Sequence, residues 1–209
     1  GVREQRGKQI VKELTGKDAK VVCDPTFLLT TDEWIEALME NEKERGLERN
    51  GEPYKIDTPY ILAYVLGERK DVREEIKKLR EQSGLKIVNL PHVDNYHAMD
   101  DNLGDINLYD VDPFDFIRLI RDAEYVVTDS FHGSVFSIQM HKKFLTFYRK
   151  PSSEKGNTNS RIDSLFNILG LSERLYKGDV FNQIKQNIDY GYVDRQVEEL
   201  RIDSLAFFK

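Results

Sequence analysis

The sequence contains few of the features that mark secreted, membrane-spanning or nucleic-acid-binding proteins. Cys23 is the single cysteine among 209 residues, so no internal disulfide can form, which favours a reducing compartment. No apolar run approaches the roughly 18 residues of a membrane-spanning helix. The net charge of −6 argues against non-specific nucleic-acid binding, which needs a basic surface. We therefore predict a cytoplasmic protein with no transmembrane segment and no nucleic-acid partner.

Several signatures of catalysis and cofactor binding are also missing. The sequence has no G-x-G-x-x-G loop, no P-loop and no G-x-S-x-G around a nucleophilic serine. His92, Asp94 and His97 lie close together, but on an irregular segment without the spacing of a known metal site. We interpret 91–110 as a solvated loop or part of a substrate-binding rim, and we predict no metal and no organic cofactor.

Apolar segments of strand length alternate with helical patterns along most of the chain. A charged helix predicted over 69–82 separates two such strands, and the right-handed crossover rule makes these strands parallel. The alternation predicts one α/β domain over 1–209 with a doubly wound, mainly parallel, Rossmann-like sheet. Strands are predicted over 20–23, 60–66, 86–90, 125–127 and 143–147.

Helix boundaries follow from capping residues. Asp112 followed by Pro113 is typical of a helix start, and Thr30 or Thr31 precedes an amphipathic segment that ends at Met39. Segment 40–58 is charged and contains glycine and proline, so we predict a solvated, mobile loop there. Further helices are predicted over 3–14, after a Ser160 cap, and over 194–208.

The stretch 124–141 joins a predicted strand directly to a helix. After the strand at 125–127 come three residues that favour turns and N-caps, and the helical pattern begins at His132. Ligands bind at the edge where parallel strands end, and a helix N-terminus attracts anions. His132 is therefore a candidate acid, base or anion donor that Asp129 could orient. The alternative is a generic turn in which His132 only caps or packs.

Four other residues are notable for their chemistry. Arg3, Arg149 and Arg161 are candidate anion clamps, because a guanidinium group pairs with carboxylate and phosphate through two hydrogen bonds. Each is also compatible with an ordinary surface arginine. Cys23 has no cationic neighbour in sequence that would lower its pKa, so we interpret it as a buried structural thiol.

The segment from Ala123 to Ile138 resembles the signature around the active-site histidine of the polysaccharide pyruvyl transferases. Supporting segments occur in the expected order and span nearly the whole chain. The resemblance implies a two-domain, glycosyltransferase-B-like architecture, of which this chain is the C-terminal half and the N-terminal half is absent. The supporting segments are Gly1-Val-Arg-Glu, Cys23-Asp-Pro-Thr-Phe-Leu-Leu, Tyr60-Ile-Leu-Ala-Tyr-Val-Leu, Ser160-Arg-Ile-Asp-Ser-Leu, Leu169-Gly-Leu and Ser204-Leu-Ala-Phe-Phe.

The resemblance also implies an activity. Such a transferase moves a pyruvyl group from phosphoenolpyruvate to a sugar of a cell-surface polysaccharide or its precursor, forms a pyruvate ketal and releases phosphate. The implied partners are phosphoenolpyruvate and a glycan or lipid-linked sugar, and a lipid-linked acceptor would place the enzyme at the membrane periphery. The isolated half is expected to be weak or inactive. The resemblance implies that His132 is the general acid and that Arg3 holds the phosphoenolpyruvate anion. Together with the candidates named above, the predicted catalytic residues are His132 and Asp129, and the predicted substrate-binding residues are Arg3, Ser130, Gly133, Ser134, Arg149 and Arg161.

One position departs from the family pattern. Some members have arginine two residues before the histidine, where this chain has Ser130. The helix N-terminus with Ser130 and Gly133 could bind the phosphate in place of that arginine, or Arg149 or Arg161 could reach into the site. A third possibility is that the enzyme uses a different donor substrate. Two alternatives thus stay open: a glycosyltransferase-B enzyme with a nucleotide-sugar donor, and a non-catalytic binding domain on the same scaffold. No feature of the sequence predicts an oligomeric state.

Overall fold

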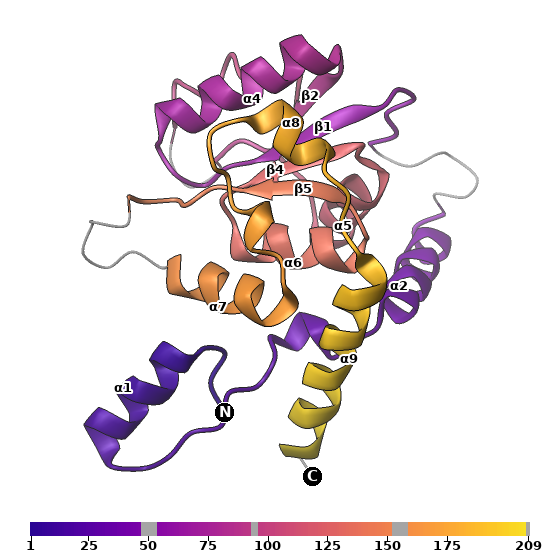
Figure 1. Ribbon diagram of the computed structural model, residues 1–209. Helices are drawn as coiled ribbons and strands as arrows, with labels where there is room; N and C mark the ends of the chain where they lie inside the picture. Colours follow the sequence, from indigo (N-terminus) through magenta and orange to yellow (C-terminus); the bar gives the residue numbers. More distant parts are fainter. Residues whose placement is uncertain (47–53, 93–95, 152–158, 208–209) are drawn as a thin grey trace.

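A parallel five-stranded sheet lies at the centre of the computed structural model, which describes residues 1–46, 54–92, 96–151 and 159–207. The strand order is β3-β2-β1-β4-β5, and every pairing is parallel. From β1 the chain first builds outward through β2 and β3, then returns to place β4 and β5 on the other side (Figure 1). This order confirms the predicted doubly wound α/β class. The strands are β1 (Tyr60–Tyr64), β2 (Lys86–Asn89), β3 (Ile106–Asn107), β4 (Tyr125–Thr128) and β5 (Lys143–Thr146).

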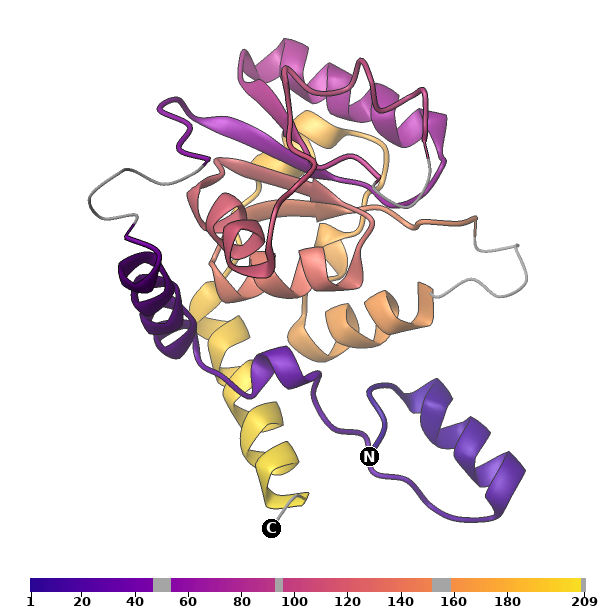
Figure 2. The same ribbon diagram turned by 180° about the vertical axis from the view of Figure 1, so that it is seen from behind.

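Helices cover both faces of the sheet, as two opposite views show (Figures 1 and 2). Side chains alternate along each strand, so successive residues enter different cores. Val126 packs in the core that contains residues of α5 and α6, whereas Val127 packs in the core with α4 and α8. The helices are α1 (Gln5–Thr15), α2 (Thr31–Glu44), α4 (Lys70–Ser83), α5 (Pro113–Asp122), α6 (Phe131–Gln139), α7 (Asn159–Leu169), α8 (Val180–Lys185) and α9 (Tyr190–Phe207), with short 3₁₀ turns η1 (Pro25–Phe27) and η2 (Ser172–Arg174).

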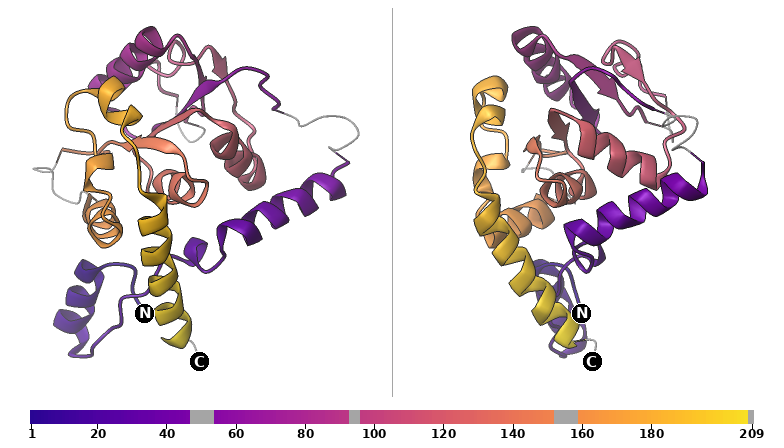
Figure 3. Two further views of the ribbon diagram at one scale, coloured as in Figure 1. Left: turned by 45° about the vertical axis from the view of Figure 1, so that its right-hand side comes forward. Right: turned by 90° about the vertical axis from the view of Figure 1, so that its right-hand side faces the viewer.

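The two ends of the described chain lie at the same end of the molecule, below the sheet in Figure 1. Here α1 lies apart from the central layers and has no buried residue (Figure 3). The segment after it returns to α9, where the amide of Cys23 donates a 2.8 Å hydrogen bond to Ser204 Oγ. Cys23 is buried, as predicted, and this burial raises the pKa of its thiol.

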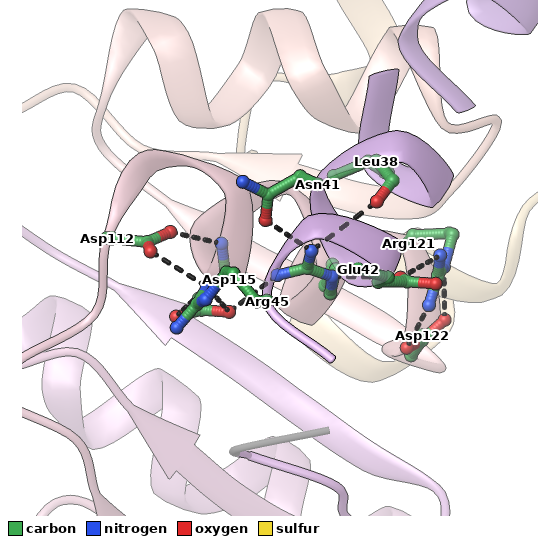
Figure 4. A network of polar contacts seen from close by, with 9 residues as sticks. Leu38, Asn41, Glu42, Arg45, Asp112, Asp115, Arg121 and Asp122 are labelled. Atoms are coloured by element: carbon green, nitrogen blue, oxygen red, sulfur yellow. Dashed lines mark hydrogen bonds and ion pairs between the residues drawn. The ribbon is translucent and has the colours of Figure 1, made fainter. Parts of the chain in front are cut away.

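A charged network fixes α2 against α5 (Figure 4). The buried guanidinium of Arg118 donates to Glu42 at 2.9 Å and to Asp115 at 2.6 Å. Arg45, just after α2, reaches Asp112 at 2.9 Å, and Asp112 in turn caps α5. Because buried charges are stable only when paired and hydrogen-bonded, this network sets the position of the α5 N-terminus beside the site described below.

Most predicted helix starts are correct, and one predicted loop is partly wrong. Thr30 and Glu33 form a full capping box, and Asp112 caps the helix that begins at Pro113. However, α2 continues through Glu44, because Arg45 beyond it is held by α5. The first residues of the predicted loop 40–58 are therefore helical, and 47–53 lie outside the described residues.

Three further local predictions need correction. Segment 20–23 forms only an isolated bridge between Val21 and Val2, since no neighbouring strand offers a longer ladder there. Ser160 lies inside α7 and donates to Glu4 at 2.8 Å instead of capping the helix. The segment 91–110 contains the two-residue strand β3. None of the helices in the described ranges is both long and apolar enough to span a membrane.

Candidate functional site

The carboxyl ends of the strands meet at one edge, and the direction of winding reverses there between β1 and β4. Asp129 directly follows β4, and its two carboxylate oxygens accept hydrogen bonds from the amides of Leu66 and Gly67, each at 2.7 Å. Those amides follow β1, so Asp129 joins the ends of the two central strands. Open α/β sheets bind ligands at this switch point.

The first turn of α6 packs tightly against the strand ends. Ser130 is the N-cap, and its Oγ accepts the Gly133 amide at 3.3 Å. A Cβ added to Gly133 would collide with the hydroxyl of Thr128, so only glycine allows this approach of helix to strand. The Ser134 hydroxyl is fully buried and bonds to Thr146 at 2.8 Å. Gly133 and Ser134 thus pack against the strand ends, and their substrate-binding roles stay predictions.

His132 emerges from this first turn with about half of its side chain exposed. Its Nε2 lies 3.7 Å from Oδ1 of Asp24, whose side chain is only 2% exposed. The other oxygen of Asp24 accepts a 2.7 Å hydrogen bond from Arg3. Burial alone would raise the pKa of Asp24, but His132, Arg3 and Thr26 outweigh it and hold that pKa well below its usual range. An ionised carboxylate beside an imidazole favours one orientation of the ring.

The carboxylate that contacts His132 in the described part of the chain is therefore Asp24, whereas both carboxylate oxygens of Asp129 accept backbone amides, and its catalytic role stays a prediction. Burial raises the pKa of Asp129, and the two backbone amides and Arg149 offset this only in part. Asp129 precedes the helix cap and turns toward β1, whereas His132 lies on the helix. The sequence signal for Asp24 was the Asp-Pro-Thr segment, which supports the family resemblance but gave Asp24 no predicted role in the site.

Two arginines lie beside Phe131, the first residue of α6. The guanidinium groups of Arg3 and Arg161 are each 5.8 Å from the centroid of the Phe131 ring. The same ring meets the His132 ring edge-on, with centroids 5.5 Å apart. Aromatic faces attract cations, so Phe131 holds both positive charges near the histidine. Arg3 also donates a hydrogen bond to Asp24, the carboxylate that contacts His132. Arg3 therefore lies close both to the Phe131 ring and to the partner of His132.

A cavity of about 270 Å³ opens at the start of α6. Ser130, His132, Arg149 and Arg161 all line it. The Arg149 Nε is buried and has no hydrogen-bond partner among the described residues, and it lies 3.8 Å from an oxygen of Asp129. Two guanidinium groups and a helix N-terminus on one cavity suit a small anion with more than one charge.

A second cavity, of about 500 Å³, also reaches His132. Its walls are mainly apolar and include Phe116 and Phe136, with His92 among the polar groups. His132 is thus shared by a cationic cavity and an apolar one, an arrangement that allows one side chain to contact two different ligands.

His92 and His97 lie close together in the described part of the segment 91–110. His92 bonds to Asp100 at 2.7 Å, and its ring lies 4.1 Å from that of His97. Asp94, the third residue considered, lies outside the described residues. In the parts of the chain that the structure describes, no three His, Cys, Asp or Glu side chains gather as metal ligands would.

Two solved structures resemble this fold. The UDP-GlcNAc 2-epimerase from Neisseria meningitidis, solved bound to UDP-GlcNAc, aligns with a TM-score of 0.50 and 12% identity over 98% of this chain and 59% of that chain. The glycotransferase of kitacinnamycin aligns with a TM-score of 0.45 and 14% identity over 75% of this chain and 43% of that one. The chain spans about half the length of these proteins. At such identity the likeness to the epimerase shows a shared, glycosyltransferase-B-like fold and nothing about activity.

Sequence comparison supplies the family. No curated protein matches significantly. Residues 1–151, by contrast, match the polysaccharide pyruvyl transferase family. The match contains Arg3, Asp24, Asp129, His132 and Arg149, and thus most of the site at the sheet edge. The chain belongs to the polysaccharide pyruvyl transferase family.

Proposed function

We propose that this chain takes part in the transfer of a pyruvyl group from phosphoenolpyruvate to a sugar of a polysaccharide or its precursor. Family membership supports a transferase that modifies polysaccharides. The phosphoenolpyruvate donor and the ketal product are our proposal. The observation that carries it is one cavity with two arginines beside a histidine whose partner is a buried carboxylate.

Phosphoenolpyruvate has a carboxylate and a phosphate on a small carbon frame, so its site needs cations and one proton donor. Arg149 and Arg161, with the N-terminus of α6, supply positive charge, and they compensate for a serine at position 130. His132 serves as the general acid that protonates the methylene carbon. Arg3 and Asp24 hold His132 in place from the other side.

The proposed transfer from phosphoenolpyruvate to the sugar conserves atoms and charge. The methylene carbon gains one proton, one sugar hydroxyl adds to the central carbon and loses its proton, and the second hydroxyl then replaces phosphate and loses its own proton. The carbon–oxygen bond to phosphate breaks, and phosphate leaves carrying one of the protons. Two hydroxyls on one sugar thus become a cyclic ketal.

We further propose that the chain acts as the C-terminal half of a two-domain enzyme, with low activity on its own. The acceptor would be a glycan or a lipid-linked sugar used in the cytoplasm. A lipid-linked acceptor would bring the enzyme to the membrane surface without a spanning helix.

Incubation of the two-domain protein with phosphoenolpyruvate and glycan acceptors tests the proposal. Phosphate should be released, and the glycan should gain the mass of one pyruvate ketal. Calorimetry with phosphoenolpyruvate and with UDP-sugars separates the alternatives. Tight UDP-sugar binding without phosphoenolpyruvate binding would favour a nucleotide-sugar donor, and binding of neither would favour a non-catalytic domain.

A further inference from the structure

His92 has one ring nitrogen held by a buried ion pair. It follows β2 at the same sheet edge, and its Nδ1 lies 2.7 Å from Oδ2 of Asp100. The other oxygen of Asp100 accepts from Nε and Nη2 of Arg73, at 2.8 and 2.7 Å. Arg73 and Asp100 are both buried. The three side chains form a chain of hydrogen bonds that fixes the orientation of the imidazole ring.

This arrangement determines which nitrogen carries the proton. Burial would raise the pKa of Asp100, but the hydrogen bonds from His92 and Arg73 outweigh it and lower that pKa, so Asp100 is an anion that only accepts. Nδ1 of His92 therefore donates to Asp100, and in the neutral tautomer with that proton the lone pair is on Nε2. That Nε2 is buried and has no hydrogen-bond partner among the described residues. A buried acceptor without a partner is rare in native proteins and calls for a ligand or a water molecule.

The cavity beside His92 selects a ligand of a particular kind. It is the 500 Å³ cavity that also reaches His132, and apolar side chains such as Leu90, Phe116 and Phe136 form its walls. The carboxylate among its described lining residues is that of Asp112, which caps α5 and pairs with Arg45. A ligand without hydrogen-bond donors could give Nε2 no hydrogen. A pyranose ring offers both hydroxyl donors and an apolar face.

We infer that this cavity binds the acceptor sugar, with a sugar hydroxyl donating its hydrogen to Nε2 of His92. The inference rests on the proposed function for the direction of transfer. The donor lies with Arg149 and Arg161, the acceptor lies with His92, and His132 lies between them. The sugar hydroxyls are thereby brought to the same histidine that protonates the donor.

The test measures sugar binding without phosphoenolpyruvate. The chain, labelled with ¹⁵N in its histidines, is titrated with methyl glycosides of glucose, galactose, mannose and N-acetylglucosamine. We expect the free protein to show an unprotonated Nε2 at His92, and at least one glycoside to shift that resonance. His92→Phe should weaken binding of that glycoside at least tenfold. His92→Gln, which keeps a hydrogen-bonding amide near the Nε2 position, should retain part of the affinity.

His97→Phe is the matched control, because it keeps an aromatic ring against His92 and removes only the nitrogens of His97. It should bind the glycoside within about twofold of the unaltered chain. Circular dichroism and the thermal midpoint report whether each variant is folded. If His92→Phe is unfolded, the glycoside affinity of His92→Gln relative to the unaltered chain is the deciding measurement.

A protonated Nε2 of His92 in the free protein, or no glycoside binding by the unaltered chain, would overturn the inference. So would equal glycoside affinities of His92→Phe and His92→Gln, or equal losses of glycoside affinity in His92→Phe and His97→Phe. Absence of phosphate release from phosphoenolpyruvate would instead count against the proposed function alone, because sugar binding is measured without the donor.

Discussion

The imidazole Nε2 of His132 lies 3.7 Å from the carboxylate of Asp24, although the two residues come from distant parts of the sequence. Asp24 follows the N-terminal segment and caps η1, whereas His132 belongs to the first turn of α6. The carboxylate is buried and the histidine is half exposed, so one partner is fixed and the other faces a ligand. We therefore propose that Asp24 positions His132.

Replacing His132 should remove the proton donor. His132→Gln in the two-domain protein is expected to lower phosphate release from phosphoenolpyruvate by about 10²- to 10⁴-fold, the usual contribution of general acid catalysis. His141→Gln is the control, because His141 also lies next to α6, is similarly exposed and pairs with Asp194 at 2.9 Å. Turnover is measured by a phosphate assay. Normal turnover in His132→Gln would refute the assigned role.

Replacing Asp24 should alter how stability depends on pH. The pKa of Asp24 is lowered in the folded chain, so its stabilising effect is present above its unfolded-state pKa of roughly 3.9 and is lost as the pH falls through the folded value. Asp24→Asn should lower the free energy of unfolding at pH 7 by about 1–3 kcal/mol, because Arg3 loses its charged partner. Urea titrations should show the difference shrinking below about pH 4.

The exposed pair of Asp194 and His141 provides the comparison for this experiment. Asp194→Asn should change the free energy of unfolding little, both at pH 7 and in the acid range, since exposed ion pairs contribute little to stability. A constant difference between the unaltered chain and Asp24→Asn across the acid range would contradict the linkage.

Replacing the arginines of the cationic cavity should weaken donor binding. Arg149→Gln and Arg161→Gln are each expected to raise the KM for phosphoenolpyruvate roughly 10- to 100-fold, the equivalent of about 1.5–3 kcal/mol for a hydrogen bond to a charged group. The KM for the acceptor should stay near its original value. Arg80→Gln is the control, because Arg80 pairs with Asp105 and does not line this cavity. An unchanged KM for the donor in both variants would place the anion elsewhere.

Gly133 should be irreplaceable because of its contact with Thr128. Gly133→Ala would push a methyl group into the Thr128 hydroxyl, and we expect it to lower stability by about 1–3 kcal/mol. Thr128→Ala removes the obstructing atoms but also a 2.7 Å hydrogen bond to Tyr64. A double-mutant cycle followed by urea denaturation should therefore show that the double variant loses less than the sum of the two single losses. Additive losses would show that the two residues do not clash.

Local sequence patterns predicted the elements of the sheet well. The strand starts at Tyr60, Lys86, Tyr125 and Lys143 are all correct, because short apolar runs bounded by turn residues need a buried, two-sided environment. The capping signals at Thr30 and Asp112 were also reliable, since an N-cap depends on residues within one turn. Short elements such as β3 and α8 were missed, because a few residues carry too little periodicity.

The candidate site was predicted only where its residues are close in sequence or have an unmistakable chemistry. His132 and Ser130 followed from the strand–turn–helix pattern, and the arginines followed from their charge. The structure turns Asp129 toward the amides that follow β1 and buries Gly133 and Ser134, so the roles of these three residues stay predictions. Sequence proximity cannot distinguish a side chain that faces a cavity from one that faces the neighbouring strand.

The sequence by itself therefore determined the α/β class, the parallel strands and the helix start that carries His132, because these depend on local periodicity and capping. The tertiary structure alone decided which carboxylate meets His132, and it placed Arg149 and Arg161 on one cavity and His92 on the next. These relationships arise where the ends of separate strands converge, and the long-range packing that brings them together leaves no signal in any single segment.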